Sequence, residues 1–425
     1  MSTQEEDGEN SRGWFDVLNT PLNACSLETY FPIPQDDAIS GSSDIPSDIP
    51  LVVGCYQLNE SSQVDGEADT VSSSTGSSRC GELRLHMIPT PSTSKDEMQF
   101  GDAACVLQME SGVLDGKWKR RRKAKQNTHL EEMPLFASAC ASGNIHIHSL
   151  EKNTSTDSNA LWSLNHITST DAQSDDAGLC LALAWNDYLN ERDDQIVSSY
   201  SKGEVAIHQI SYCGDNTNAV PPKLEETHRW NAHTLFGCPS EVWTCSFLRG
   251  AENVVLSGAD DCSMKVWDIR QTHRPVHKVG DTEFEAGVTA ISSHPSLDNI
   301  FAVGSYDEHV RLYDYRKMNE PLSKVSVGGG VWRIKWHPST WSGESSSYRG
   351  KLLVAAMHGG CRVVNFPSLN DNLTEYTTEE DAEILSEFTA HDSMAYGADW
   401  ISFGSSELEA AASCSFYDRK AFIWD

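Results

Sequence analysis

The stretch LSGADDCSMKVWDIR, residues 256–270, decides the fold of this 425-residue chain. It contains a short strand-like run, a polar turn and an alternating run that ends in an aromatic residue and Asp. The same order recurs in VGSYDEHVRLYDYR (303–316) and ASCSFYDRKAFIWD (412–425). A preceding motif also repeats, because GVTAISSHP (287–295) and GVWRIKWHP (330–338) share their spacing. Short strands that recur with polar turns between them indicate a repeat protein built from β-sheets.

These copies resemble the WD40 repeat, and weaker copies extend the resemblance over the chain from about Trp14 to Asp425. The resemblance implies an all-β fold, a seven-bladed WD40 β-propeller with long disordered loop insertions. We expect residues 1–13 to form a disordered acidic N-terminus. Residues 14–20 are expected to supply the outer strand of the last blade, which closes the ring and leaves no open edge. We expect the blades at about residues 21–90, 100–151, 178–211, 229–270, 284–316, 328–368 and 386–425.

The composition excludes several classes of function. Lys and Arg number 32 against 62 Asp and Glu, a net charge of −30, which argues against a protein that binds nucleic acid directly. No long apolar run and no signal peptide is seen, so we expect a cytoplasmic protein without membrane contact. The 12 cysteines are scattered with no zinc-type spacing, and we interpret them as reduced thiols. No metal or organic cofactor is indicated, and we expect a monomer.

The WD40 resemblance also separates structural polar residues from candidate functional ones. In WD40 blades, a His before the first strand, an Asp in the tight turn before the last strand and the Trp of that last strand form a hydrogen-bonded set. Two sets match this pattern: His233, Asp261 and Trp267, and His391, Asp418 and Trp424. In another blade, Asp307 and Tyr313 occupy the positions of the Asp and the Trp. His391 is therefore interpreted as structural and not as a catalytic base.

The same register places a further set of residues around one end of the central channel, where propellers bind ligands. The turn positions are Asp260, Tyr306, Met357 and Tyr417, and the strand entries are Glu241, Trp243, Trp332 and Tyr396. Five of these eight side chains are aromatic and two are acidic, and Glu308 adds a third carboxylate. One interpretation is an ordinary peptide-binding face. The other is a site for a quaternary ammonium group, which aromatic rings attract through their quadrupoles.

Several motifs exceed the general WD40 pattern. GSYDEHVRLYD, GGGVWRIKWHP, AMHGG, HDSMAYGADW and CSFYD, in this order, resemble the diphthine methylesterase family of WD40 proteins. The resemblance implies hydrolysis of the methyl ester of methylated diphthine, the modified histidine of translation elongation factor two, as a step of diphthamide biosynthesis. It implies this factor as the protein partner, with other proteins of the diphthamide pathway as further candidates. The substrate that it implies carries a trimethylammonium group close to the ester.

Ester hydrolysis needs a base and a nucleophile or activated water. His358 is the preferred base, because it occupies the turn position where other blades have the structural Asp; the alternative is an ordinary polar turn residue. Ser393 is a candidate nucleophile or a turn cap, and the preceding Asp392 is a further catalytic candidate. Arg333 is a candidate to hold the carboxylate product, or it pairs with an acidic neighbour.

Two features support other interpretations. WDIR (267–270) and YDYR (313–316) fit the pattern of WD40 substrate receptors of cullin ubiquitin ligases, which are non-catalytic binding modules, and a general scaffold is a further alternative. The basic run Lys117 to Lys125 holds seven positive charges. It is read as a solvated insertion in the second blade, with a nuclear import signal or an RNA contact as alternatives.

Overall fold

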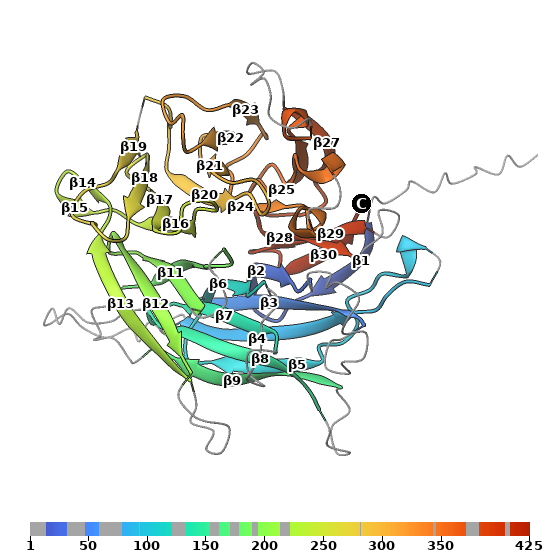
Figure 1. Cartoon of the computed structure of the whole chain (residues 1–425). Helices are drawn as coiled ribbons and strands as arrows, with labels where there is room; N and C mark the ends of the chain where they lie inside the picture. Colours follow the sequence, from blue (N-terminus) through green and yellow to red (C-terminus); the bar gives the residue numbers. More distant parts are fainter. Residues whose placement is uncertain are drawn as a thin grey trace, which may run out of the picture.

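The chain forms seven antiparallel sheets of four strands, arranged in a ring around a common centre (Figure 1). The computed structural model describes residues 14–31, 47–58, 79–92, 94–120, 133–153, 161–170, 178–188, 194–212, 222–280, 282–342, 346–370, 382–403 and 409–425. In each sheet the first strand lies innermost and contacts the first strands of the neighbouring blades, so that β2 contacts both β6 and β28. The all-β class and the seven blades predicted from the sequence are confirmed.

The strands run in chain order through the blades. The first three blades contain β2 (Asn23–Thr29), β3 (Ile49–Leu58), β4 (Arg79–Ile88), β5 (Cys105–Met109), β6 (Val113–Trp118), β7 (Leu135–Cys140), β8 (Ile145–Lys152), β9 (Trp162–Ser169), β10 (Cys180–Trp185), β11 (Asp194–Tyr200), β12 (Glu204–Ser211) and β13 (Lys223–Asn231). The next two blades contain β16 (Val242–Phe247), β17 (Val254–Ala259), β18 (Ser263–Asp268), β19 (His277–Val279), β20 (Val288–Ser293), β21 (Ile300–Ser305), β22 (His309–Asp314) and β23 (Ser323–Ser326).

The last two blades complete the ring. They contain β24 (Arg333–Trp336), β25 (Lys351–Ala355), β26 (Cys361–Asn365), β27 (Glu383–Phe388), β28 (Ala395–Ser402), β29 (Glu409–Ser415), β30 (Lys420–Trp424) and β1 (Trp14–Asn19). A separate hairpin, β14 (Thr234–Leu235) and β15 (Cys238–Pro239), joins the third and fourth blades. In the described part of the chain, helical structure consists of α1 (Ser339–Ser342) and the short 3-10 turns Lys95–Glu97, Ser346–Tyr348 and Pro367–Leu369. Within the described ranges, no helix has the length and apolar character needed to cross a membrane.

The N-terminal strand closes the ring. β1 pairs antiparallel with β30, with Asn19 opposite Lys420 and Trp14 opposite Trp424, and the two strands lie side by side in Figure 1. The seventh blade therefore combines strands from both ends of the described chain. This arrangement covers the edge of β30, which would otherwise be free to pair with another chain.

The predicted blade ranges are too short at their ends. In five blades the fourth strand lies beyond the predicted range; these strands are β9, β13, β19, β23 and β27. In addition, β5 belongs to the first blade, although the predicted second blade begins at residue 100. The physical reason is that the repeated motif ends with the third strand. The outer strands are half solvated and carry little hydrophobic pattern; β27, for example, is mostly exposed.

The hydrophobic core lies between neighbouring blades. One cluster of buried side chains joins the fifth and sixth blades around Val310, Val331 and Leu352, and similar clusters fill the other gaps. Tryptophans near the ends of four innermost strands tie each of these blades to the one before. Each indole N–H donates to a backbone carbonyl there: Trp118 to Glu28, Trp185 to Lys117, Trp336 to Ser292, and Trp400 to Lys335.

Candidate functional site on the top face

The predicted structural sets are present as hydrogen-bonded chains. The Trp267 indole N–H donates to Ser257 Oγ (2.9 Å), and Ser257 contacts His233 Nε2 (2.7 Å). Because an ionised carboxylate only accepts, His233 Nδ1–H donates to Asp261 (2.9 Å). These contacts confirm the structural role predicted for His233, and the sequence analysis missed only the serine.

The second set has the same order of residues, with a longer distance between His and Asp. His391 contacts Ser413 Oγ through Nε2 (2.8 Å), and Trp424 donates to the same hydroxyl (3.0 Å). Asp418 lies 3.8 Å from His391 Nδ1. His391 is thus engaged inside the blade, which agrees with its predicted structural role.

In the fifth blade a buried arginine replaces the histidine. Arg311 donates to both carboxylate oxygens of Asp307 (2.9 and 2.8 Å) and to Glu283 (2.6 Å). Its guanidinium also lies over the ring of Phe284, 4.8 Å from the centroid. Asp307 therefore has the structural role that its turn position predicts.

The aromatic residues predicted at the channel end are in contact with one another. Trp332, at the entry of β24, lies at their centre, with ring centroids 5.4 Å from Trp243, 6.0 Å from Tyr306 and 4.9 Å from Tyr396. Trp332 is only 8% exposed, and its buried indole N–H has no hydrogen-bond partner among the described residues. An unpaired buried donor at the centre of a binding face is available to a ligand acceptor. We call these four residues the aromatic cluster.

Further aromatic side chains pack next to the aromatic cluster. Phe416 lies 5.4 Å from Tyr396 and 4.9 Å from both Tyr56 and Tyr417, measured between ring centroids. Tyr417 is 63% exposed and forms the outer end of this series. The sequence analysis missed Phe416 and Tyr56. Phe416 directly precedes the turn position that was used, whereas Tyr56 belongs to a blade whose repeat is too degenerate to give a register.

Two carboxylates lie beside the aromatic cluster. The Trp243 indole N–H donates to Asp260 Oδ1 (2.6 Å), and the Asp260 backbone N–H donates to the Glu241 carbonyl (3.1 Å). Burial and the nearby charge of Asp260 raise the pKa of Glu241. Burial and the same charge raise the pKa of Tyr306, and burial together with Tyr417 raises the pKa of Tyr396 to about 12, so both phenols are neutral at pH 7. The site therefore combines neutral rings with an excess of negative charge, which suits a cation.

His358 lies next to this site and has a carboxylate neighbour. Its side chain is 66% exposed, and Nε2 lies 3.8 Å from Glu308 Oε1. The Met357 carbonyl accepts the Ala395 N–H (3.0 Å), so the turn with His358 adjoins the entry of β28, where Tyr396 lies.

Among the described residues, no hydrogen bond or ion pair joins His358 to Ser393 or Asp392. Asp392 instead pairs with Lys420 (2.6 Å) and is 70% exposed. The catalytic roles of His358, Ser393 and Asp392 stay predictions, with Glu308 as the carboxylate that the structure brings to His358.

Arg333 points into the channel below the aromatic cluster. It lies 3.3 Å from Asp115, and its guanidinium lies 5.5 Å from the Trp332 ring centroid. The alternative that Arg333 pairs with an acidic neighbour therefore fits the structure.

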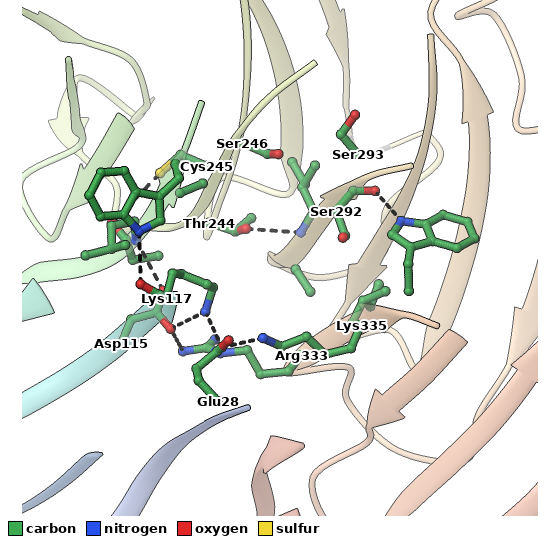
Figure 2. Close-up of a pocket in the computed structure, with 18 of the residues that line it drawn as sticks. Glu28, Asp115, Lys117, Thr244, Cys245, Ser246, Ser292, Ser293, Arg333 and Lys335 are labelled. Atoms are coloured by element: carbon green, nitrogen blue, oxygen red, sulfur yellow. Dashed lines mark hydrogen bonds and ion pairs between the residues drawn. The ribbon is translucent and has the colours of Figure 1, made fainter. Parts of the chain in front are cut away.

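The channel itself contains a group of charges that the sequence analysis missed. It is a cavity of about 150 Å³ in which Glu28, Asp115, Lys117, Arg333 and Lys335 point toward one another (Figure 2). Lys117 bridges Glu28 (2.8 Å) and Asp115 (2.7 Å), and Lys335 pairs with Glu28. Together with Asp399, 3.6 Å from Lys335, these residues form the channel charge cluster.

These charges stabilise one another. Burial opposes ionisation, but Lys117 and Arg333 outweigh it and hold the pKa of Asp115 below its usual range. In return, Asp115 and Glu28 overcome the effect of burial and raise the pKa of Lys117. The cluster contains three carboxylates and three cations, so it adds no net charge. In the described part of the chain, no group of three or more His, Cys, Asp or Glu is placed to hold a metal ion.

The position of Lys117 corrects the interpretation of the basic run. Lys117 and Trp118 belong to the innermost strand β6, and Lys119 pairs with Asp194. Arg120 lies over the rings of Phe31 and Trp341. The start of the run is thus part of the propeller, where Lys117 lines the channel and Lys119 and Arg120 pack against neighbouring blades, and a solvated insertion is wrong for it. Residues 121–125 lie outside the described residues.

Seven four-stranded blades, two of them with a His–Ser–Asp–Trp chain, define a WD40 propeller with an aromatic, acidic top face. The model of the WD domain, G-beta repeat, matches residues 227–268 and 275–314. A chain of the crystal structure of the mitotic checkpoint complex superposes with a TM-score of 0.56 over 100% of this chain and 98% of its own, at 12% identity, which shows the fold alone.

Relatives of known name define the family. The chain is 30% identical to the diphthine methyltransferase homolog of Dictyostelium discoideum over 75% of this chain and 77% of the relative, and 32% identical to the human diphthine methyltransferase over 72% and 59%. The chain belongs to this diphthine methyltransferase family. The E3 ubiquitin-protein ligase COP1 of Arabidopsis thaliana is 34% identical over 85 residues, 20% of this chain. The chain spans less than two thirds of the human relative's length.

Proposed function

We propose that this protein acts in diphthamide biosynthesis and hydrolyses the methyl ester of methylated diphthine on translation elongation factor two. Water adds to the ester carbonyl, and the bond from the carbonyl carbon to the methoxy oxygen breaks. The products are methanol, a carboxylate and one released proton. Family membership supports the pathway. The observation that carries the assignment to this site is the aromatic cluster around the unpaired Trp332 indole, with Glu241 and Asp260 beside it.

The residues of the site divide the task. The aromatic cluster and the two carboxylates bind the trimethylammonium group. His358 takes the proton from the attacking water, and Glu308 stabilises the resulting imidazolium from 3.8 Å. The buried Trp332 N–H is the donor for a substrate oxygen. Ser393 is the alternative nucleophile.

The test separates ester hydrolysis from methyl transfer. The purified protein is incubated with a peptide that carries methylated diphthine, and methanol release is measured without and with an added methyl donor. We expect methanol without a donor. The variant His358→Ala should lose this activity and keep its melting temperature, while the exposed control His273→Ala keeps both. Methyl transfer to the substrate at the expense of the donor would contradict hydrolysis, and full activity of His358→Ala would exclude His358 as the base.

A second candidate function is that of a substrate receptor for a cullin ubiquitin ligase. The Asp268–Arg270 and Asp314–Arg316 pairs occupy equivalent strand ends, each with a closest contact of 2.6 Å, and the arginines are 69% and 58% exposed. If this function holds, Arg270→Ala with Arg316→Ala loses binding to the ligase adaptor in a pull-down but retains ester cleavage. Undiminished adaptor binding would remove the support that these pairs give.

A further inference from the structure

A small hairpin projects from the propeller directly before the candidate site. Strands β14 and β15 pair Thr234 with Pro239 and Leu235 with Cys238, so Phe236 and Gly237 form a two-residue turn. All six residues from 234 to 239 are exposed, and Phe236 is 98% exposed. No ring contact of Phe236 with any other described residue is present. A fully exposed aromatic tip gains nothing for the fold.

The backbone at this tip is unfavourable for the residue that occupies it. Phe236 has a φ of 51° and Gly237 a φ of 82°. A two-residue turn with positive φ at both positions favours Asn, Asp or Gly at the first position, and a bulky residue rarely adopts it. Asn at position 236 would form the same turn with less strain. Strained residues of this kind concentrate at functional sites.

The base of the hairpin is rigid. The flanking residues His233 and Ser240 are buried, and the Ser240 N–H donates to the His233 carbonyl (3.2 Å). The His233 side chain is held by Asp261. The hairpin therefore presents Phe236 in a fixed position and costs little ordering on binding.

The hairpin belongs to the same face as the aromatic cluster. Ser240 leads directly into Glu241, and Trp243 follows two residues later. Phe236 and Glu241 are five positions apart in the sequence, so the tip lies within about 17 Å of the acidic part of the site. The hairpin is therefore close enough to the site for one protein ligand to contact both Phe236 and the aromatic cluster.

We infer that the hairpin 234–239 is a docking element for the folded protein substrate, which inserts Phe236 into an apolar pocket beside the modified histidine. This inference rests on the proposed function, and it assigns recognition of the intact protein to the hairpin and recognition of the modified side chain to the aromatic cluster. Aromatic anchors that enter a pocket carry a large share of binding energy at protein interfaces.

The test compares two substrates and two variants. The substrates are elongation factor two with methylated diphthine and a short peptide that carries the same side chain. Phe236→Asn removes the ring and suits the positive φ, so its fold is kept and its melting temperature is equal or higher. Leu161→Ala, at a residue 57% exposed beside the second blade's outer strand, is the control.

We expect Phe236→Asn to raise KM for the intact factor roughly tenfold and to leave the kinetics with the peptide unchanged. Leu161→Ala changes neither. An unchanged KM for the intact factor, or an equal loss with both substrates, overturns the inference.

Affinity for the intact factor, measured separately by biolayer interferometry, distinguishes this failure from failure of the proposed function. If the wild-type protein cleaves neither substrate, the proposed function is wrong. In that case, docking by the hairpin is still supported if Phe236→Asn binds the intact factor more weakly than the wild-type protein does. Docking is overturned if both proteins bind the factor equally or neither binds it.

Discussion

Trp332 is the residue on which recognition of a cation depends most, because three other aromatic rings surround it. We expect Trp332→Leu to weaken binding of a trimethylammonium ligand by about 1–2 kcal/mol and to affect its neutral tert-butyl isostere less. Isothermal titration calorimetry with both ligands measures the difference, which is independent of any fraction of unfolded variant. Equal losses for the two ligands would show that the contact is merely apolar.

Glu241 gives the site a dependence on pH. Burial and the charge of Asp260 raise the pKa of Glu241, so Glu241 takes up a proton at a higher pH than an ordinary glutamate does. A bound cation favours the ionised form, so affinity for the trimethylammonium ligand is highest above this raised pKa and falls as the pH is lowered through it. Glu241→Gln should bind more weakly at pH 7 and lose this part of the pH dependence. A wild-type affinity that is constant down to the ordinary range of Glu would contradict this role.

At the scale of elements, the hydrogen-bonded chain from Trp267 to Asp261 stabilises the fourth blade. Burial opposes ionisation of Asp261, but the hydrogen bond and charge of His233 outweigh it and lower its pKa to about 2. The unfolded value is about 3.9. Since the folded pKa is the lower one, this stabilisation is complete above pH ~4 and is lost as the pH falls toward 2.

Asp261→Asn should therefore lower the free energy of unfolding by about 1–3 kcal/mol at pH 7 and by less at pH ~3. Denaturant titrations at the two pH values measure this difference. The control Asp298→Asn, at a side chain 62% exposed and paired with Arg249, should change stability by less than about 1 kcal/mol. A cost for Asp261→Asn that is the same at both pH values would show that its charge is not the stabilising feature.

The elements also show what the sequence could predict. Strands such as β17 and β18 were predictable, because their alternating pattern and the turn between them repeat in other blades. The same repeat register predicted the positions of the residues in the aromatic cluster around Trp332. Outer strands such as β13 and β27 were not predictable, because their exposed faces leave little hydrophobic pattern.

The channel charge cluster was missed for a different reason. Its members come from distant parts of the chain, as Glu28 and Lys335 do, and only ring closure brings them together. A single sequence gives no sign of such a pairing. The sequence does show an alternation of charged residues in RIKW (333–336), which places Arg333 and Lys335 on the same side of an innermost strand. This alternation indicates a charged channel wall but not the partners of these residues.

At the scale of the whole molecule, the channel charge cluster joins the first, second, sixth and seventh blades. Lys335 contacts both Glu28 and Asp399 and is 13% exposed. We expect Lys335→Met to lower the free energy of unfolding by about 3–5 kcal/mol, because two buried carboxylates lose a cation. Lys324→Met, at a residue 33% exposed and 3.8 Å from Glu283, should cost less than about 1 kcal/mol. Chemical denaturation compares them, and equal effects would show that the cluster does not hold the ring together.

The activity that we propose for this propeller is cleavage of the methyl ester on a modified histidine. The most direct measurement is the intact mass of elongation factor two bearing methylated diphthine, followed over time with the purified protein and no added methyl donor. We predict that the factor loses the mass of one methylene at the modified histidine, with one methanol released per molecule. An unchanged mass in the presence of folded protein would contradict the claim.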